Sequence, residues 1–180
     1  MSFAGLVLAG GAASRLSGVD KPMLEVGGEP LLRKAVRALG GADEVIVVGS
    51  ERPGFDDVVW TSEHPPRGGP VAALAAGLAL VRAEVVVVLA GDLARVEVST
   101  VDKLRAAVCG RDGALLVDAG GYRQWLAGAW RTGRLRAALA EEPRAKSLRA
   151  VMSRLDFAEI PDSAGESADV DTPEDYDRFR

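Results

Sequence analysis

The sequence predicts a three-layer α/β/α sandwich with a mostly parallel, Rossmann-like central sheet, folded as a single domain over residues 1–180. Continuous apolar runs at 3–9, 44–50 and 84–92 are bounded by glycine or charged residues, as strands buried on both faces are. Helical patterns alternate with these runs along the whole chain. This alternation favours parallel strands with helices on both faces of the sheet.

The remaining elements follow from local signals. A weaker strand pattern at 57–61 indicates a position nearer an edge of the sheet, and Ser99 is a candidate N-cap. Further strands are expected at 113–119 and 122–131. The predicted helices are 30–41, 69–83, 99–110, 132–141 and 146–154, with a short closing helix from Pro173, because proline is favoured at the first helical position.

The composition excludes several classes of function. The net charge is -4, so no global basic field would attract nucleic acid or an anionic membrane. One cysteine and one histidine cannot form an internal disulfide or a zinc site, and Cys109 is expected to be a small buried hydrophobe. The first residues lack a basic segment, and the apolar run at 85–90 is too short to cross a bilayer. We therefore expect a cytoplasmic protein.

A glycine-rich loop follows the first predicted strand. Open α/β sheets bind ligands beyond the carboxyl ends of their strands, and backbone N–H groups at Gly10 and Gly11 could hold phosphate oxygens there. Arg15 and Lys21 could add charged donors, with Asp20 orienting Lys21. The alternative is a simple turn with two surface cations. Neither the dinucleotide-binding nor the P-loop pattern is present, which disfavours a dehydrogenase or a P-loop kinase.

The stretch LAGGAASRLSGVDK, residues 8–21, resembles the N-terminal signature of the molybdenum cofactor nucleotidyltransferases. The matching residues are Leu8, Ala9, Gly10, Gly11, Arg15, Gly18, Asp20 and Lys21. The Leu-Ala-Gly-Gly start and the Asp-Lys pair favour the guanylyltransferase branch. The resemblance implies a Mg²⁺-dependent enzyme that moves GMP from GTP onto molybdopterin or its molybdenum form and releases pyrophosphate. It also implies molybdoenzymes or cofactor-biosynthesis proteins as partners.

Acidic residues supply the candidate metal site. Asp92 directly follows a predicted buried strand, and carboxylate oxygens are the ligands that Mg²⁺ prefers. The resemblance places a metal-binding aspartate here, whereas a plain cap of the next helix is the alternative. Asp169 and Asp171 alternate, so both would face one side of an extended segment. Asp171 is a candidate second metal ligand and Asp169 a candidate acceptor-binding residue; a solvated acidic turn is the alternative.

The resemblance also implies candidates for base and acceptor recognition. Gly68, Gly69 and Pro70 would open a helix near the nucleotide base, and Glu63 could accept hydrogen bonds from guanine. Basic residues of the later helices could meet a phosphorylated acceptor, although a solvated face is the alternative. These basic candidates are Arg134, Arg144, Lys146 and Arg149.

The proposed chemistry leaves rivals open. Many guanylyl-transferring members carry asparagine where this chain has Asp169 and Asp171, so a CTP-dependent or sugar-phosphate enzyme remains an alternative. A non-catalytic nucleotide-binding homologue is a further one. Arg15, Lys21 and Asp92 together favour catalysis by charge neutralisation and positioning, with Lys21 and Asp92 expected in exposed loops.

Overall fold

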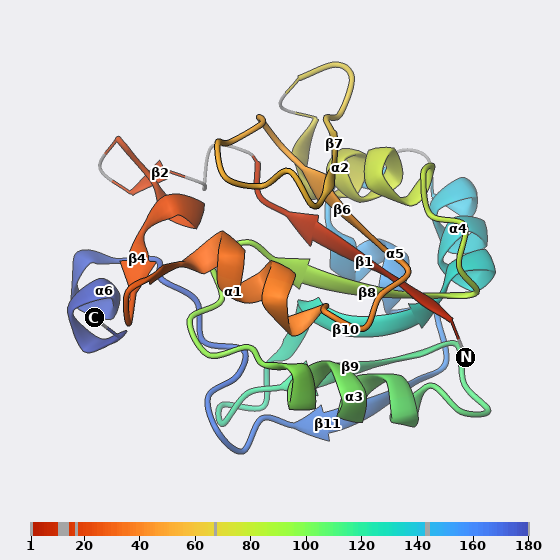
Figure 1. Ribbon diagram of the computed structural model, residues 1–180. Coiled ribbons are helices and arrows are strands. Elements are labelled where there is room, and N and C mark those ends of the chain that lie inside the picture. The colour runs from red at the N-terminus through yellow and green to blue at the C-terminus, as the bar shows by residue number, and fades with distance from the viewer. Residues whose placement is uncertain (1, 11–14, 17, 67, 143–144, 180) are drawn as a thin grey trace.

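The computed structural model describes residues 2–10, 15–16, 18–66, 68–142 and 145–179, with only the backbone for 15–16. Its centre is a seven-stranded sheet in the order β11-β9-β10-β8-β1-β6-β7 (Figure 1). The strands are β1 Phe3–Leu8, β6 Glu44–Val48, β7 Val59–Thr61, β8 Val85–Ala90, β9 Gly113–Val117, β10 Arg123–Arg131 and β11 Phe157–Pro161. Only β10 among these runs antiparallel to its neighbours.

Helices cover both faces of this sheet, with α1 and α3 on one face and α2, α4 and α5 on the other (Figure 1). The helices are α1 Leu31–Ala38, α2 Gly69–Leu78, α3 Val98–Ala107, α4 Thr132–Glu141, α5 Leu148–Met152 and α6 Pro173–Phe179. Two short hairpins pair β2 Arg15–Leu16 with β3 Val19–Asp20 and β4 Glu25–Val26 with β5 Glu29–Pro30, on either side of the 3-10 helix η2 Lys21–Met23. The predicted α/β/α class is confirmed.

The two faces of the sheet explain why its central strands are apolar throughout. Along β1, Val7 packs with α1 and α3, whereas Leu6 packs with α2 and α4. In β8, alternate valines divide between the same two cores. Cys109 belongs to neither core: it follows α3 and is exposed, so the expectation of a buried thiol is wrong.

Two local differences from the sequence-based expectation have physical causes. The α3 N-cap is Glu97 rather than Ser99, because Glu97 and Thr100 form a reciprocal capping box. β11 was not expected, since its short sequence FAEIP contains a glutamate and ends in proline. It is an edge strand beside β9, where these features are tolerated. The strand at the other edge is β7, as the weak pattern at 57–61 predicts.

The strand order reverses at β1, which places a topological switch point at the carboxyl ends of β1 and β8. The chain leaves β1 toward β6 on one side, and β8 then pairs with β1 on its other side. Ligands of open α/β sheets bind at such a switch point. The fold thus directs attention to the residues that follow Leu8 and Ala90.

Gly77 allows α2 to pack closely on the sheet. A Cβ added there would lie 2.3 Å from Leu6 Cδ1 and 2.8 Å from Val48 Cγ2. We predict that Gly77→Ala lowers the free energy of unfolding by about 1–3 kcal/mol through overpacking. Gly133, exposed in α4, has open space around it, and Gly133→Ala is expected to stabilise by up to about 1 kcal/mol. Urea unfolding measures both, and an unchanged Gly77→Ala protein would contradict the packing argument.

Candidate active site

Three loops meet at the carboxyl ends of the central strands. The Ala9 N–H donates to Val48 O at 2.9 Å, and the Gly91 N–H donates to Leu8 O at 3.0 Å. A Cβ at Gly91 would lie 2.9 Å from Ala9 Cβ. A Cβ at Gly49, where φ is +150°, would lie 3.1 Å from the carbonyl carbon of Ala9. Glycine at both positions lets the three loops pack directly on one another and fixes the start of the glycine-rich loop.

An acidic cluster lies at the carboxyl ends of these central strands. It consists of Asp92, Asp169 and Asp171, and one carboxylate oxygen of each lies within 4.8 Å of those of the other two. The backbone brings the three together: Leu93 and Asp169 form an antiparallel bridge, and the Val170 N–H donates to Asp92 O at 3.3 Å. The C-terminal segment therefore returns to the end of β8, and the alternating aspartates reach the same place as Asp92.

The cluster carries more negative charge than its surroundings neutralise. Burial raises the pKa of Asp92 to about 6, together with the nearby charges of Asp169 and Asp171 and against the opposing effect of Lys21. Burial, followed by the charge of Asp171, also raises the pKa of Asp169. Crowded carboxylates with raised pKa values have the donor atoms and the charge that a divalent cation requires. The residues present thus fit Mg²⁺.

Lys21 supplies the one cation bonded to this cluster among the described side chains. Its Nζ donates to Asp171 Oδ1 at 2.6 Å. Lys21 begins η2 and is only 5% exposed, so the expectation of an exposed loop lysine is wrong. Its ammonium bonds with Asp171 of the C-terminal segment, while its own side chain is shielded from solvent. The side chain is thereby held in one place.

Asp20 does not orient Lys21, contrary to expectation. Its carboxylate accepts two hydrogen bonds from Arg52, from Nε at 2.6 Å and from Nη2 at 2.8 Å. Arg52 also donates to Ala9 O at 3.0 Å and to Ser50 O at 3.1 Å. Sequence reasoning missed Arg52, because one arginine in a loop 32 residues from its partner carries no local signal.

The C-terminal segment is shaped by two polar turns. Asp162 accepts hydrogen bonds from the N–H groups of Glu166 and Ser167 at 2.8 and 2.9 Å. Burial alone would raise the pKa of Asp162, but the hydrogen bonds from Ser167 and Glu166 outweigh it and hold this pKa well below its usual range. Thr172 and Asp175 bond reciprocally at the start of α6, so these two residues cap this helix. Asp169 and Asp171 lie between the turns.

The other predicted residues divide into three groups. Gly10 is exposed at the same edge of the sheet, whereas Gly11 and the Arg15 side chain lie outside the described residues. Glu63 is half-buried and lies next to the start of α2: its Cγ is 3.8 Å from a Cβ built on Gly68, and Gly69 follows with φ +84°. The third group contains the basic candidates.

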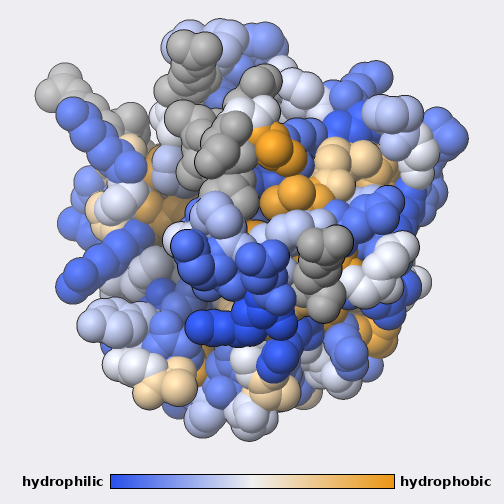
Figure 2. Space-filling model, turned by 90° about the vertical axis from the view of Figure 1, so that its left-hand side faces the viewer, coloured by the Kyte–Doolittle hydropathy of each residue, from blue (hydrophilic) through white to orange (hydrophobic). Residues whose placement is uncertain are grey.

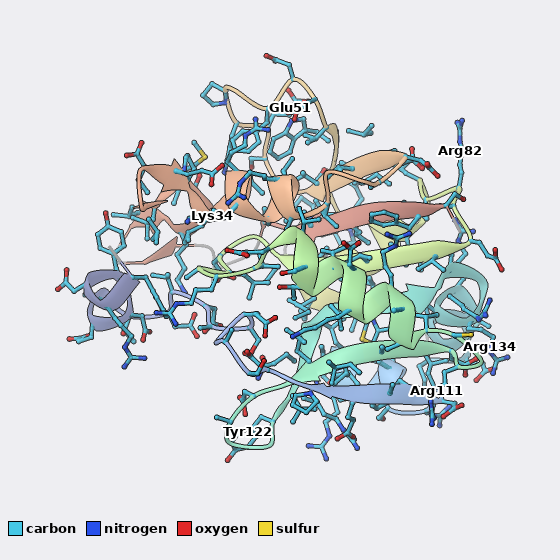
Figure 3. All side chains as sticks on the ribbon, turned by 60° about the horizontal axis from the view of Figure 1, so that its bottom comes forward. Lys34, Glu51, Arg82, Arg111, Tyr122 and Arg134 are labelled. Atoms are coloured by element: carbon cyan, nitrogen blue, oxygen red, sulfur yellow. The ribbon has the colours of Figure 1, made fainter. Side chains whose placement is uncertain are left out.

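Of the basic candidates, Arg134 forms an ion pair far from α6. It pairs with Asp112 at 2.8 Å and lies near Arg111, at the end opposite α6 (Figure 3). Arg149 is exposed on α5, and within the described part of the chain no hydrogen bond or ion pair joins it to the acidic cluster. Arg144 lies outside the described residues. The face of the molecule that presents α6 is mainly hydrophilic (Figure 2).

Comparison with known proteins identifies the class. Solved structures of nucleotidyltransferases share this α/β fold over almost the entire chain. A family model described as "MobA-like NTP transferase domain" matches residues 5–159, and the chain belongs to this family. The resemblance drawn from residues 8–21 is confirmed.

Named relatives agree with this assignment. A probable molybdenum cofactor guanylyltransferase of Synechococcus elongatus is 34% identical over 116 residues, 60% of this chain and 59% of the relative. The match thus spans less than two thirds of that relative. Molybdopterin-guanine dinucleotide biosynthesis protein A of Archaeoglobus fulgidus shares the fold with a TM-score of 0.74 at 18% identity, covering 98% of this chain and 96% of the other. 2-C-methyl-D-erythritol 4-phosphate cytidylyltransferase of Thermus thermophilus shares the fold with a TM-score of 0.75 at 22% identity, covering 99% of this chain and 97% of the other.

The helices of the protein are short, and α2, for example, has 10 residues. Within the part of the chain that the structure describes, no helix combines the length and the apolar character that a membrane span requires.

The raised pKa of Asp92 predicts a pH-dependent stability. Between its ordinary value of 3.8 and its folded value of about 6, the folded state holds the proton more tightly, so its stability falls as pH rises through this window. We predict that Asp92→Asn removes this loss. In metal-free buffer the variant should be more stable than the wild type by about 1–2 kcal/mol at pH 7.5, with little difference below pH 4.

Urea unfolding at several pH values in EDTA measures this difference. Asp43→Asn is the matched control. Asp43 is exposed and bonds through its backbone to Phe3, at the amino end of β1 and so at the end of the strands opposite the acidic cluster. A stability difference for Asp92→Asn that does not change between pH 4 and pH 7.5 would contradict the predicted burial of charge.

Proposed function

We propose that this protein is a Mg²⁺-dependent nucleotidyltransferase that moves GMP from GTP onto the phosphate of a molybdopterin-type acceptor and releases pyrophosphate. One observation carries the proposal: a buried lysine and three carboxylates lie together at the switch point, beside the start of the glycine-rich loop. Membership of the MobA-like family and relatives named as guanylyltransferases support the choice of donor and acceptor. A cytoplasmic site of action and contact with cofactor-biosynthesis proteins or molybdoenzymes belong to the same proposal.

Asp92 and Asp171 would hold the metal ion, with Asp169 as a further donor or as a contact for the acceptor. Mg²⁺ there would offset the charge of the triphosphate and lower the cost of charge that builds up in the transition state. Burial and neighbouring negative charge raise the pKa values of Asp92 and Asp169, so the ionised carboxylates lack compensating positive charge. A bound cation would supply that charge, which supports this assignment.

The reaction needs no protein nucleophile. An oxygen of the acceptor phosphate attacks the α-phosphorus of the nucleotide, and the bond to the β-phosphate breaks with its electron pair leaving on pyrophosphate. The work of the chain is positioning and neutralisation of charge. The N–H groups at Gly10 and Gly11 would bind the triphosphate, while Lys21 and Arg15 would donate to its oxygens. Lys21 can do so from a fixed position because it is already buried.

Base selection would involve Glu63 and the start of α2. A carboxylate can accept the two hydrogen bonds that the ring N–H and the amino group of guanine donate. Glu63 lies beside Gly68, directly before the exposed residues Gly69 and Pro70 that begin α2. Arg149 remains a proposed acceptor contact from the exposed surface of α5.

The nucleotide and the reaction can be tested together. We predict pyrophosphate release from GTP in the presence of Mg²⁺ and molybdopterin, and much less from CTP, ATP or UTP. Apparent thermal stability should rise most with Mg²⁺ and GTP, since a ligand that binds the folded state stabilises it. Preference for CTP would favour the cytidylyl-transferring rival. Binding without release would favour a non-catalytic homologue.

Asp92→Asn and Lys21→Met should each lower kcat by at least about 100-fold, because each removes a charge that the transition state requires. Lys21→Met is also expected to lower stability, since it leaves Asp171 and the rest of the cluster without their bonded cation. Asp156→Asn is the matched control: Asp156 pairs with Arg111 at 2.7 Å, far from the cluster. Full activity in Asp92→Asn would contradict the proposed metal site.

A further inference from the structure

We propose that Arg52 is a positioning residue of this site, which fixes both ends of the glycine-rich loop and thereby the place of Lys21; the inference rests on the nucleotidyltransferase function proposed above. The Arg52 guanidinium joins three segments. It donates to Ala9 O at the start of the loop, to the carboxylate of Asp20 at its end, and to Ser50 O in its own loop after β6.

Among the described residues, no other hydrogen-bonded side chain connects Ala9 with Asp20. Ala9 is anchored to β6 through its N–H, whereas Asp20 belongs to the two-residue strand β3, outside the central sheet. A loop of about ten residues has a substantial closure entropy, which a bond across its base offsets. The Arg52 side chain is only 9% exposed and its bonds to Asp20 and Ala9 are partly buried, which strengthens them relative to bonds in water.

Arginine is the side chain that this role requires. Its planar fork places two parallel N–H groups on one carboxylate, here Asp20 at 2.6 and 2.8 Å, and still has N–H groups left for two carbonyl oxygens. Lysine is a point charge with three donors on a flexible stem. It can keep the charge but not this geometry.

Arg52 also determines which carboxylate the Lys21 ammonium pairs with. Asp20 precedes Lys21 in the chain, and a free carboxylate there would compete with Asp171 and with phosphate oxygens for the ammonium. Because Arg52 occupies the Asp20 carboxylate, Lys21 bonds with Asp171 on the opposite side. The structure thus separates two ion pairs on adjacent residues, one that holds the loop and one that faces the acidic cluster.

The test compares Arg52 with an arginine of similar bonding elsewhere. Arg33 of α1 forms a two-bond ion pair with Asp57 at 2.8 and 3.0 Å, donates to Gly54 O, and bonds with none of the described residues between 9 and 21. Arg52→Met and Arg33→Met should lose comparable stability. For protein that is equally folded, Arg52→Met should lose about 30- to 100-fold in kcat/KM for GTP, because small misplacements of catalytic groups have effects of this size. By the same reasoning, Arg33→Met should lose less than about threefold.

Two further variants separate positioning from general stability. Arg52→Lys should fall between the wild type and Arg52→Met. Asp20→Asn should lower kcat/KM as well, and the double variant Arg52→Met/Asp20→Asn should be no worse than Arg52→Met alone, since both changes break one pair. Additive losses in the double variant, or a folded Arg52→Met within about threefold of the wild type, would overturn the inference. Should Arg52→Met not fold, Arg52→Lys and Asp20→Asn decide it by the same measure.

Hydrogen exchange gives a readout that does not depend on activity. The Leu24 N–H donates to Lys21 O at 2.9 Å, so its exchange reports on the order of η2. It should exchange faster in Arg52→Lys than in the wild type and be unchanged in Arg33→Met. An unchanged Leu24 amide would count against Arg52, whereas a wild-type protein that neither binds nor turns over any nucleotide would count against the proposed function.

Discussion

The bond between Lys21 and Asp171 is the constraint on which the site depends. It joins residues 150 positions apart and connects the N-terminal loop region to the segment that returns at the end of the chain. A buried ammonium is costly without a partner, and crowded carboxylates are costly without a cation. Each side of the site therefore supplies what the other lacks. Asp171 gives the buried Lys21 its partner, and Lys21 offsets part of the repulsion between Asp171 and Asp92.

A rigid sheet makes this arrangement possible. β1 and β8 lie side by side and are buried on both faces, so the residues that follow them begin from fixed points. The loops above them are held by contacts that need glycine at Gly49 and Gly91, and by Arg52 at the base of the glycine-rich loop. Placing functional groups in loops on a rigid scaffold is the usual division of labour in α/β proteins. Here the loops are also bonded to one another.

What could be predicted from the sequence follows from which interactions are local. Valine runs, glycine ends and the position of Asp92 after a strand are readable within a short window, and the alternation of Asp169 and Asp171 indicated a shared side. The burial of Lys21 and the role of Arg52 depend on partners far away in the chain, and no periodicity encodes them. The expectation for Cys109 failed at a helix boundary: α3 ends at Ala107, so the cysteine lies beyond the helix and is exposed.

The two aspartates of the C-terminal segment change the electrostatics of the site. Many guanylyl-transferring members of the nucleotidyltransferase group that this chain resembles carry asparagine at these positions. Asparagine would supply oxygen donors without charge. Asp169 and Asp171 instead add negative charge beside Asp92 and raise its pKa. This chain thus has a greater need for cations at the switch point, which Lys21 meets in part. The charge of Asp171 holds Lys21 at the cluster, and it is the same charge that the proposed Mg²⁺ would require, so metal binding and the placement of Lys21 would be coupled through Asp171.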